Sequence, residues 1–253
     1  MYGIKQLYRK DYSGEEVNTI GLFKDSKWAY QTSYITNPFT NLPKSNNALV
    51  IGNGITQQGF DLKLILENRN GVGSPWKMPA MMPKKFNTYG CNALYRDYKP
   101  DFLIVTGDQI ADELVNSGYC DTGVVYGRGY HVPQYPGRFH FVPQDPQWNA
   151  GAVATYLAAF DGHKKVFLYG FDGADTDNYF YNVYAGTPGY PTVDTDVLED
   201  YWIRSMLEVF NTYKETEFIR VARRANARVP DPWKYCLNFR AIDINRFPIE
   251  CGL

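Results

Sequence analysis

The sequence is poor in the residues that build metal centres and disulfide frameworks. It holds only four cysteines and three histidines among 253 residues, and it has neither a CxxC pair nor a cysteine close to a histidine. A zinc centre and a disulfide scaffold are therefore not expected, and we expect reduced thiols in a cytoplasmic protein. The cysteines are Cys91, Cys120, Cys236 and Cys251.

Long apolar runs and an excess of charge of one sign are also absent. No stretch approaches the ~18 apolar residues of a membrane-spanning helix, and the opening residues, MYGIKQLYRKDYSGEE, lack the apolar segment of a signal peptide. The 26 basic and 27 acidic residues nearly cancel, so the basic excess typical of nucleic-acid binders is missing. We therefore expect no membrane span and no nucleic-acid partner.

Three common catalytic motifs are missing as well. The chain has no GxSxG, HExxH or GxxxxGKS/T stretch, which argues against a serine hydrolase, a zinc protease and a P-loop NTPase. Hydrophobic residues make up 44% of the chain, enough for a sizeable core, and 21 tyrosines are present. Tyrosine suits ligand stacking, although a tyrosine-rich surface without such a role is an equally good interpretation.

Short apolar runs alternate with helical patterns from Asn47 onward. This alternation is typical of βαβ units, and it predicts an open, mostly parallel, Rossmann-like α/β sheet with helices on both faces. We expect one such domain over 46–225, between an irregular N-terminal extension (1–45) and a C-terminal tail (226–253) without periodicity. The predicted strands are 48–51, 86–94, 101–108, 122–128, 139–142, 164–173 and 217–223, and the predicted helices are 109–118, 149–163 and 194–213.

A Gly-Asn-Gly turn follows the first predicted strand. In a parallel sheet the carboxyl ends of the strands share one edge, where ligands bind. Gly52, Asn53 and Gly54 therefore have two interpretations, a tight turn alone or a backbone that a phosphate can approach. The stretch does not match the dinucleotide fingerprint GxGxxG, because the third residue after Gly54 is Gln57.

Four further polar residues are expected at the same edge. Asn92 offers donors and an acceptor to a sugar or a base, and its alternative role is to cap the segment that follows. Asp108 suits a ribose hydroxyl or the N-cap of the next helix, while Asn149 marks a helix start that favours an anion or is itself only a cap. Asp172 ends the strand that follows the alanine-rich helix.

Acidic triplets raise the question of a divalent metal. Asp175-Thr176-Asp177 lies in a predicted loop and is the better candidate, because paired carboxylates suit hard cations. Asp194-Thr195-Asp196 fits a helix start better. No residue is assigned as a metal ligand on this evidence.

The three histidines differ in their predicted surroundings. His131 lies in a loop rich in proline, glycine and tyrosine and is the one candidate for a general base. His140 falls in a predicted strand, where a structural role is expected. His163 is expected in a surface turn.

The order of several segments resembles a known enzyme family. ALVIGNG, TYGCNALYRDY, PDFLIVTGD, NAGAVATYLAAFDGHKKVFLYGFDG and an acidic amphipathic helix follow one another as in the bacterial sialyltransferases of glycosyltransferase family 42 and their bacterial and phage relatives. The resemblance covers roughly residues 48 to 223, and it rests on order and spacing because each motif is weak alone. It implies a glycosyltransferase that takes a CMP-type nucleotide sugar and a glycan acceptor.

The resemblance also implies roles for individual residues. The family's GNG loop and the Asn of its CN motif help to bind the cytidine nucleotide. The family has a serine where this chain has Asn149-Ala150-Gly151, and of its two tyrosines near the donor phosphate the first falls near Ala174 and the second on Tyr179 or Tyr181. The predicted nucleotide-binding residues are Gly52, Asn53, Gly54, Asn92, Asp108, Asn149, Gly151, Tyr179 and Tyr181.

The family's catalytic histidine has no counterpart here. Tyr190 stands in its place, and tyrosine, with a reference pKa near ~10, is a poor base at neutral pH. Tyr190, His131 and Asp172 are the candidate catalytic residues. The departure leaves an alternative open, a non-catalytic binding or structural module on the same fold, for example a phage-encoded or virion-associated protein. A homo-oligomer or a virion partner is compatible with either function.

Overall fold

The computed structural model describes residues 16–24, 27–35, 45–59, 86–143, 146–172, 182–190, 199–223 and 227–251. Its strands are β1 (Glu16–Lys24), β2 (Lys27–Ile35), β3 (Asn47–Ile51), β4 (Asn87–Cys91), β5 (Phe102–Ile104), β6 (Val124–Gly127), β7 (His140–Phe141), β8 (Lys165–Tyr169), β9 (Glu217–Ala222) and β10 (Phe239–Asp243). Its α-helices are α2 (Asp108–Asn116), α3 (His131–Gln134), α4 (Ala150–Phe160), α5 (Glu199–Thr212) and α6 (Phe247–Cys251). Its 3-10 helices are η2 (Ile55–Gly59), η3 (Asn92–Arg96), η4 (Tyr119–Asp121), η5 (Asp231–Tyr235) and η6 (Ile244–Arg246).

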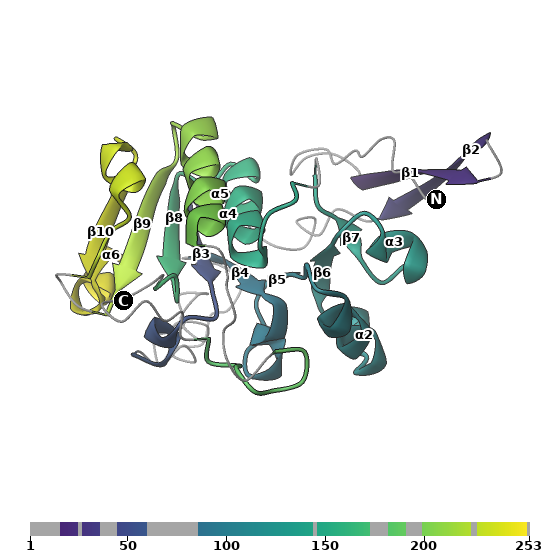
Figure 1. Cartoon of the computed structure of the whole chain (residues 1–253), viewed down its shortest axis with the longest axis horizontal. Coiled ribbons are helices and arrows are strands. Elements are labelled where there is room, and N and C mark those ends of the chain that lie inside the picture. The colour runs from purple at the N-terminus through teal and green to yellow at the C-terminus, as the bar shows by residue number, and fades with distance from the viewer. Residues whose placement is uncertain are drawn as a thin grey trace, which may run out of the picture.

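An eight-stranded parallel sheet forms the centre of the molecule. Its strand order is β10-β9-β8-β3-β4-β5-β6-β7, and every neighbouring pair is parallel. Helices α4 and α5 cover one face, and α2 lies on the other (Figure 1). The predicted α/β class is confirmed. Within the described residues, no helix combines the length and apolar character that crossing a bilayer requires.

The chain builds this sheet in two directions from β3. It first adds β4, β5, β6 and β7 on one side, and then returns through α4 to place β8 on the other side of β3. The carboxyl ends of β3 and β8 therefore form the topological switch point, where open α/β sheets leave room for a ligand.

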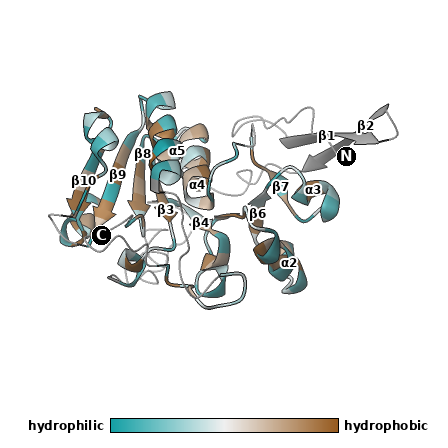
Figure 2. Ribbon diagram, viewed as in Figure 1, coloured by the Kyte–Doolittle hydropathy of each residue, from teal (hydrophilic) through white to brown (hydrophobic). Residues whose placement is uncertain are grey.

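The central strands are almost entirely buried because both faces of the sheet are covered, and most of their residues are apolar. Leu49 and Ile51 pack into the core beneath α2, whereas Ala48 and Val50 pack into the core beneath α4. Figure 2 shows the resulting hydrophobic colouring along the strands. The alanines of α4, all of them buried, let that helix lie close to the sheet.

Two segments are more regular than the sequence indicates. β1 and β2, within the predicted irregular extension, pair as a two-stranded antiparallel sheet. β10, within the predicted C-terminal tail, forms an edge of the main sheet. Only Ile242 of β10 is buried, so this edge strand lacks the continuous apolar run by which the central strands were recognised.

The prediction that His163 lies in a surface turn is wrong, because its ring is fully buried. Its Nδ1 lies 2.7 Å from the carbonyl oxygen of Ser45. The Tyr89 hydroxyl lies 2.9 Å from His163 Nε2 and 2.7 Å from Asp161 Oδ2. These polar groups satisfy one another inside the protein, which allows the turn after α4 to be buried.

Replacing Tyr89 by phenylalanine should lower the free energy of unfolding by about 1–3 kcal/mol, because buried Asp161 and His163 lose a shared partner. Tyr169→Phe is the matched control: Tyr89 lies on β4 and Tyr169 on β8, the two strands that flank β3. The Tyr169 hydroxyl has no hydrogen-bond partner among the described residues, so its loss should change stability by less than about 0.5 kcal/mol. Urea denaturation measures both changes. Equal losses of stability in the two variants would contradict a stabilising role for the hydrogen bonds of the Tyr89 hydroxyl.

Candidate functional site

The glycine turn after β3 is bonded to the end of β8. The amide of Gly52 donates to the carbonyl of Tyr169 at 2.7 Å, and the amide of Gly54 donates to the carbonyl of Gly170 at 2.9 Å. Neither amide is left to hold a phosphate. The predicted phosphate contact through these two N–H groups is therefore not supported by the geometry.

The same contact explains why glycine occupies these positions. A Cβ on Gly52 would lie 2.7 Å from the Gly170 carbonyl oxygen, and one on Gly54 would lie 2.6 Å from the same atom and closer still to the Asp172 carboxylate. Gly170 has a φ of +74°, and its own Cβ would lie 2.6 Å from the Gly52 carbonyl oxygen. The loops after β3 and β8 thus pack so closely that a side chain at any of these three glycines would collide with the other loop. We call this contact the interlock.

The carboxylate of Asp172 is engaged in this interlock. It accepts hydrogen bonds from the Thr56 amide at 2.8 Å and from the Thr56 hydroxyl, and so caps the start of η2. The carbonyl oxygen of Asp172 accepts from the guanidinium of Arg220. This arrangement gives Asp172 a structural role, and its predicted role as a base stays a prediction.

Asn53 and Tyr190 meet above the switch point. Asn53 Nδ2 donates to the Tyr190 hydroxyl at 3.0 Å, and the amide of Ala93 donates to the same oxygen at 3.4 Å. Burial raises the pKa of Tyr190 to about 12, against the opposing effect of hydrogen bonds from Ala93, Asn53 and Asn92. The phenol therefore stays protonated at neutral pH. Asn53 Oδ1 is buried and has no hydrogen-bond partner among the described residues.

Asn92 joins the ends of β4 and β5. Its Oδ1 accepts from the amide of Thr106 at 3.2 Å, and its φ of +45° is the one positive value outside glycine in the described backbone. A strained conformation of this kind is often found at functional sites, and asparagine tolerates it better than most residues. The neighbouring Cys91 is no candidate nucleophile, because burial raises the pKa of its thiol to about 12.

Asp108 and His131, predicted separately, form a hydrogen-bonded pair. Helix α2 begins at Asp108, and Gly107 occupies the N-cap position, so the predicted N-cap role of Asp108 is wrong. Its carboxylate turns instead to His131, whose Nε2 lies 3.1 Å from Asp108 Oδ1. The amide of Arg128 donates to His131 Nδ1 at 3.2 Å. Both ring nitrogens of this buried histidine are thus occupied.

Asn149 caps α4, as one of its two interpretations predicts. Its Oδ1 accepts from the amide of Ala152 at 3.0 Å. Asn149 Nδ2 is buried and has no hydrogen-bond partner within the described part of the chain. Gly151 lies in the first turn beside the ring of Phe171, which a Cβ would approach to 3.2 Å. The start of α4 therefore lies next to the end of β8.

Residues 182–190, which we call the strap, cross this edge of the sheet. The amide of Val183 donates to the carbonyl of Asn53 at 2.9 Å, and Asn182 forms an antiparallel bridge with Gly54. At the other end of the strap, Gly189 packs so tightly on Ile110 of α2 that a Cβ would lie 2.7 Å from its side chain. The strap thereby brings Tyr190 to Asn53.

Arg96 holds the strap in place, and the sequence provided no signal for this. Its Nε donates to Glu113 Oε1 of α2 at 2.7 Å. Its Nη1 and Nη2 donate to the Thr187 hydroxyl and the Pro188 carbonyl, each at 2.6 Å. The Tyr184 hydroxyl adds a 2.8 Å bond to Asp97 Oδ2. One guanidinium thus joins η3, α2 and the strap.

The remaining predicted residues lie outside the described part of the chain. They are Tyr179, Tyr181, and the acidic triplets Asp175-Thr176-Asp177 and Asp194-Thr195-Asp196. Among the residues that are described, no group of three or more His, Cys, Asp or Glu side chains is arranged to hold a metal ion.

Two solved structures are similar to this chain. One is a point variant of the sialyltransferase CST-II in complex with CMP, at 10% identity and a TM-score of 0.42, covering 68% of this chain and 80% of the other. The second is the monofunctional alpha-2,3-sialyltransferase Cst-I from Campylobacter jejuni, at 12% identity and a TM-score of 0.45, covering 77% and 81%. No protein-family model and no curated protein matches. At these identities and TM-scores, neither similarity assigns a residue or a substrate to this chain.

Gly54→Ala should destabilise the protein by about 1–3 kcal/mol, because the new methyl group collides with the β8 loop. Gly107→Ala is the matched control at the end of β5, where a Cβ meets nothing within 4 Å and φ is −103°. It should change stability by less than about 1 kcal/mol. Chemical denaturation tests the pair, and a tolerated Gly54→Ala would refute the interlock.

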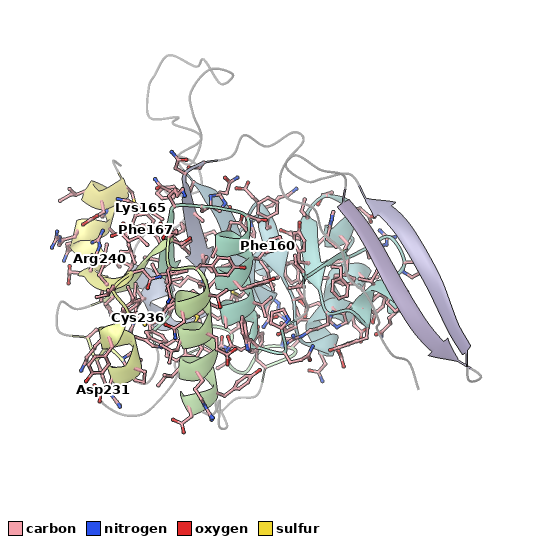
Figure 3. The ribbon with its side chains drawn as sticks, turned by 90° about the horizontal axis from the view of Figure 1, so that it is seen from above. Phe160, Lys165, Phe167, Asp231, Cys236 and Arg240 are labelled. Atoms are coloured by element: carbon pink, nitrogen blue, oxygen red, sulfur yellow. The ribbon has the colours of Figure 1, made fainter. Side chains whose placement is uncertain are left out.

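Arg96→Lys should loosen the strap, since lysine keeps the charge but cannot reproduce the forked contacts. We expect amide hydrogen exchange at Val183 and Tyr190 to accelerate about tenfold, equivalent to about 1.4 kcal/mol. Arg240→Lys is the matched control. Arg240, which Figure 3 labels at the β10 edge, makes similar bonds to Glu217 and Glu250. Unchanged exchange in Arg96→Lys would show that other contacts hold the strap.

Proposed function

We propose that this protein is a nucleotide-sugar-dependent glycosyltransferase of the sialyltransferase type, with a CMP-sugar as donor. The main support is the convergence of Asn53, Asn92 and Tyr190 at the carboxyl edge of the sheet, beside the switch point. Asn53 and Asn92 belong to the motifs that resemble the family's cytidine-binding segments. The proposal therefore has separate support from sequence order and from the position of side chains.

The carboxamide of Asn53 is suited to recognising a nucleoside. One of its polar atoms is bonded to Tyr190, and the other is buried and has no partner among the described residues. A buried amide oxygen without a partner costs free energy that a ligand donor would recover. A base amino group or a ribose hydroxyl supplies such a donor.

The start of α4 is suited to the donor phosphate. Its first-turn amides favour negative charge, and Asn149 Nδ2 adds a buried donor with no partner among the described residues. When the sugar leaves, charge develops on the nucleotide phosphate, and donors already in place stabilise it. Tyr179 or Tyr181 remains the predicted tyrosine partner of that phosphate.

A second candidate function is a non-catalytic binding module on the same fold. It is favoured by the state of the three predicted bases: Tyr190 is protonated, Asp172 caps η2, and His131 is buried with both nitrogens bonded. A virion-associated or phage-encoded role belongs to this second candidate. Cleavage of a nucleotide-sugar donor separates the two functions.

Thermal unfolding with CMP, UMP, GMP and AMP tests the nucleotide site. A nucleotide at 100 times its Kd should add about 2.7 kcal/mol, and we expect CMP to give the largest effect. Asn92→Ala should weaken CMP binding by a few-fold to about tenfold, corresponding to ~0.5–1.5 kcal/mol for a lost hydrogen bond. Asn245→Ala, in η6, is the control that should leave binding unchanged. If none of the four nucleotides stabilises the protein, the proposal fails.

A further inference from the structure

Asp108 is a mostly exposed carboxylate held by a buried histidine. Its side chain is 67% exposed, whereas that of His131 is fully buried. His131 Nδ1 accepts from the Arg128 amide, so the single proton of the neutral ring belongs on Nε2, which donates to Asp108. The hydrogen-bond pattern thus makes His131 a donor to Asp108 and leaves the ring no lone pair for a substrate.

The position of the His131 ring is set by its surroundings. Its centroid lies 4.5 Å from that of Tyr130 and 5.5 Å from that of Phe139. Gly127 at the end of β6 makes room for it, since a Cβ there would lie 3.0 Å from Nδ1. A donor fixed in this way restricts the carboxylate to one orientation. Because the ring is neutral, its contact with the mostly exposed carboxylate is a directional hydrogen bond and not an ion pair.

Asp108 lies at the same edge as the proposed nucleotide site. Two residues before it, the amide of Thr106 donates to Asn92 Oδ1 at 3.2 Å. Two residues after it, Ile110 packs against Gly189, the neighbour of Tyr190 in the strap. The carboxylate therefore belongs to the short segment that contacts both Asn92 and the strap.

The carboxylate of Asp108 is ionised at neutral pH and mostly exposed, so it can be reached by an acceptor hydroxyl. Hydrogen bonds from Tyr130 and His131 lower the pKa of this carboxyl, which stabilises the anion and makes it a weaker base than a free carboxylate. In the described part of the chain, Tyr130 and His131 are the titratable groups that act on it. By contrast, the Tyr190 phenol is protonated and the Asp172 carboxylate is bonded to Thr56.

We propose that Asp108 is the general base of this site and that His131 is its positioning residue, an inference that rests on the proposed function. The Asp108 carboxylate takes the proton of the acceptor hydroxyl while the acceptor oxygen bonds to the anomeric carbon of the donor. The bond from that carbon to the phosphate oxygen breaks, and its electron pair leaves with the nucleotide. Without a glycan, water takes the acceptor's place and the products are CMP and free sugar.

Asp108→Asn in the full chain is the direct test, with CMP-sialic acid as donor and water as acceptor. We expect CMP release to fall by about 10²–10⁴-fold, the usual contribution of a general base. The Kd for CMP should stay within about twofold, because asparagine keeps an acceptor oxygen for the ribose hydroxyl that the sequence predicts as a partner of Asp108. Asp112→Asn is the matched control, because Asp112 is exposed on the same helix and also bonded to a tyrosine, Tyr135. It should leave both quantities unchanged.

His131→Phe tests the positioning role through the pH profile, because phenylalanine keeps a ring beside Tyr130 and Phe139 and removes the Nε2–H donor. Losing that donor destabilises the ionised carboxylate and raises its pKa, so the acidic limb of the rate profile should move to higher pH. A purely structural role would lower the rate without moving this limb. If His131→Phe does not fold, His131→Leu takes its place with the same expected shift, and an unmoved limb in the variant that folds overturns the positioning role. Asp108→Ala with added formate tests the base itself, and formate should restore part of the lost rate.

The outcomes separate this inference from the proposed function. Normal CMP release by Asp108→Asn overturns the assignment of the base. A wild-type protein that binds CMP but does not accelerate donor cleavage also overturns it, and leaves the nucleotide site standing. Absence of CMP binding overturns the proposed function, and the assignment with it.

Discussion

The close contact between the loops after β3 and β8 determines the geometry of the whole site. The amide of Gly54 reaches the Gly170 carbonyl only because neither residue carries a side chain. Thr56 and Asp172 close the contact from the side through their own hydrogen bonds. Asn53 is carried on this turn, so the direction of its carboxamide depends on the packing of two glycines beneath it.

The strap extends this constraint across the sheet. Asn53 contacts it twice, through its backbone carbonyl and through its side chain, and Arg96 fixes the far end to α2 and η3. Each attachment is modest alone, but together they place the Tyr190 hydroxyl among Asn53, Asn92 and the Ala93 amide. A site made of loops is thereby held by rigid elements, which reduces the cost of ordering it when a ligand binds.

The two ionisable groups Tyr190 and Asp108 lie at this edge in different surroundings, and this gives them different protonation states at neutral pH. Tyrosine is protonated at neutral pH, and burial raises the pKa of Tyr190 further, to about 12, so its hydroxyl exchanges hydrogen bonds with its neighbours. Asp108 is exposed and stabilised as an anion by Tyr130 and His131. The same edge thus contains a neutral hydroxyl that exchanges hydrogen bonds and an exposed carboxylate that carries a charge.

The sequence by itself determined the parallel sheet and which residues lie at its carboxyl edge, because both have local signals. Central strands read as apolar runs, and the glycines and asparagines after them mark the edge where such sheets bind ligands. The contacts of these residues were decided by the tertiary structure. Asn53 and Tyr190 are 137 positions apart, Arg96 and Thr187 are 91 apart, and Asp108 and His131 are 23 apart. Contacts over such separations depend on how strands and loops pack, which no short pattern of residues reports.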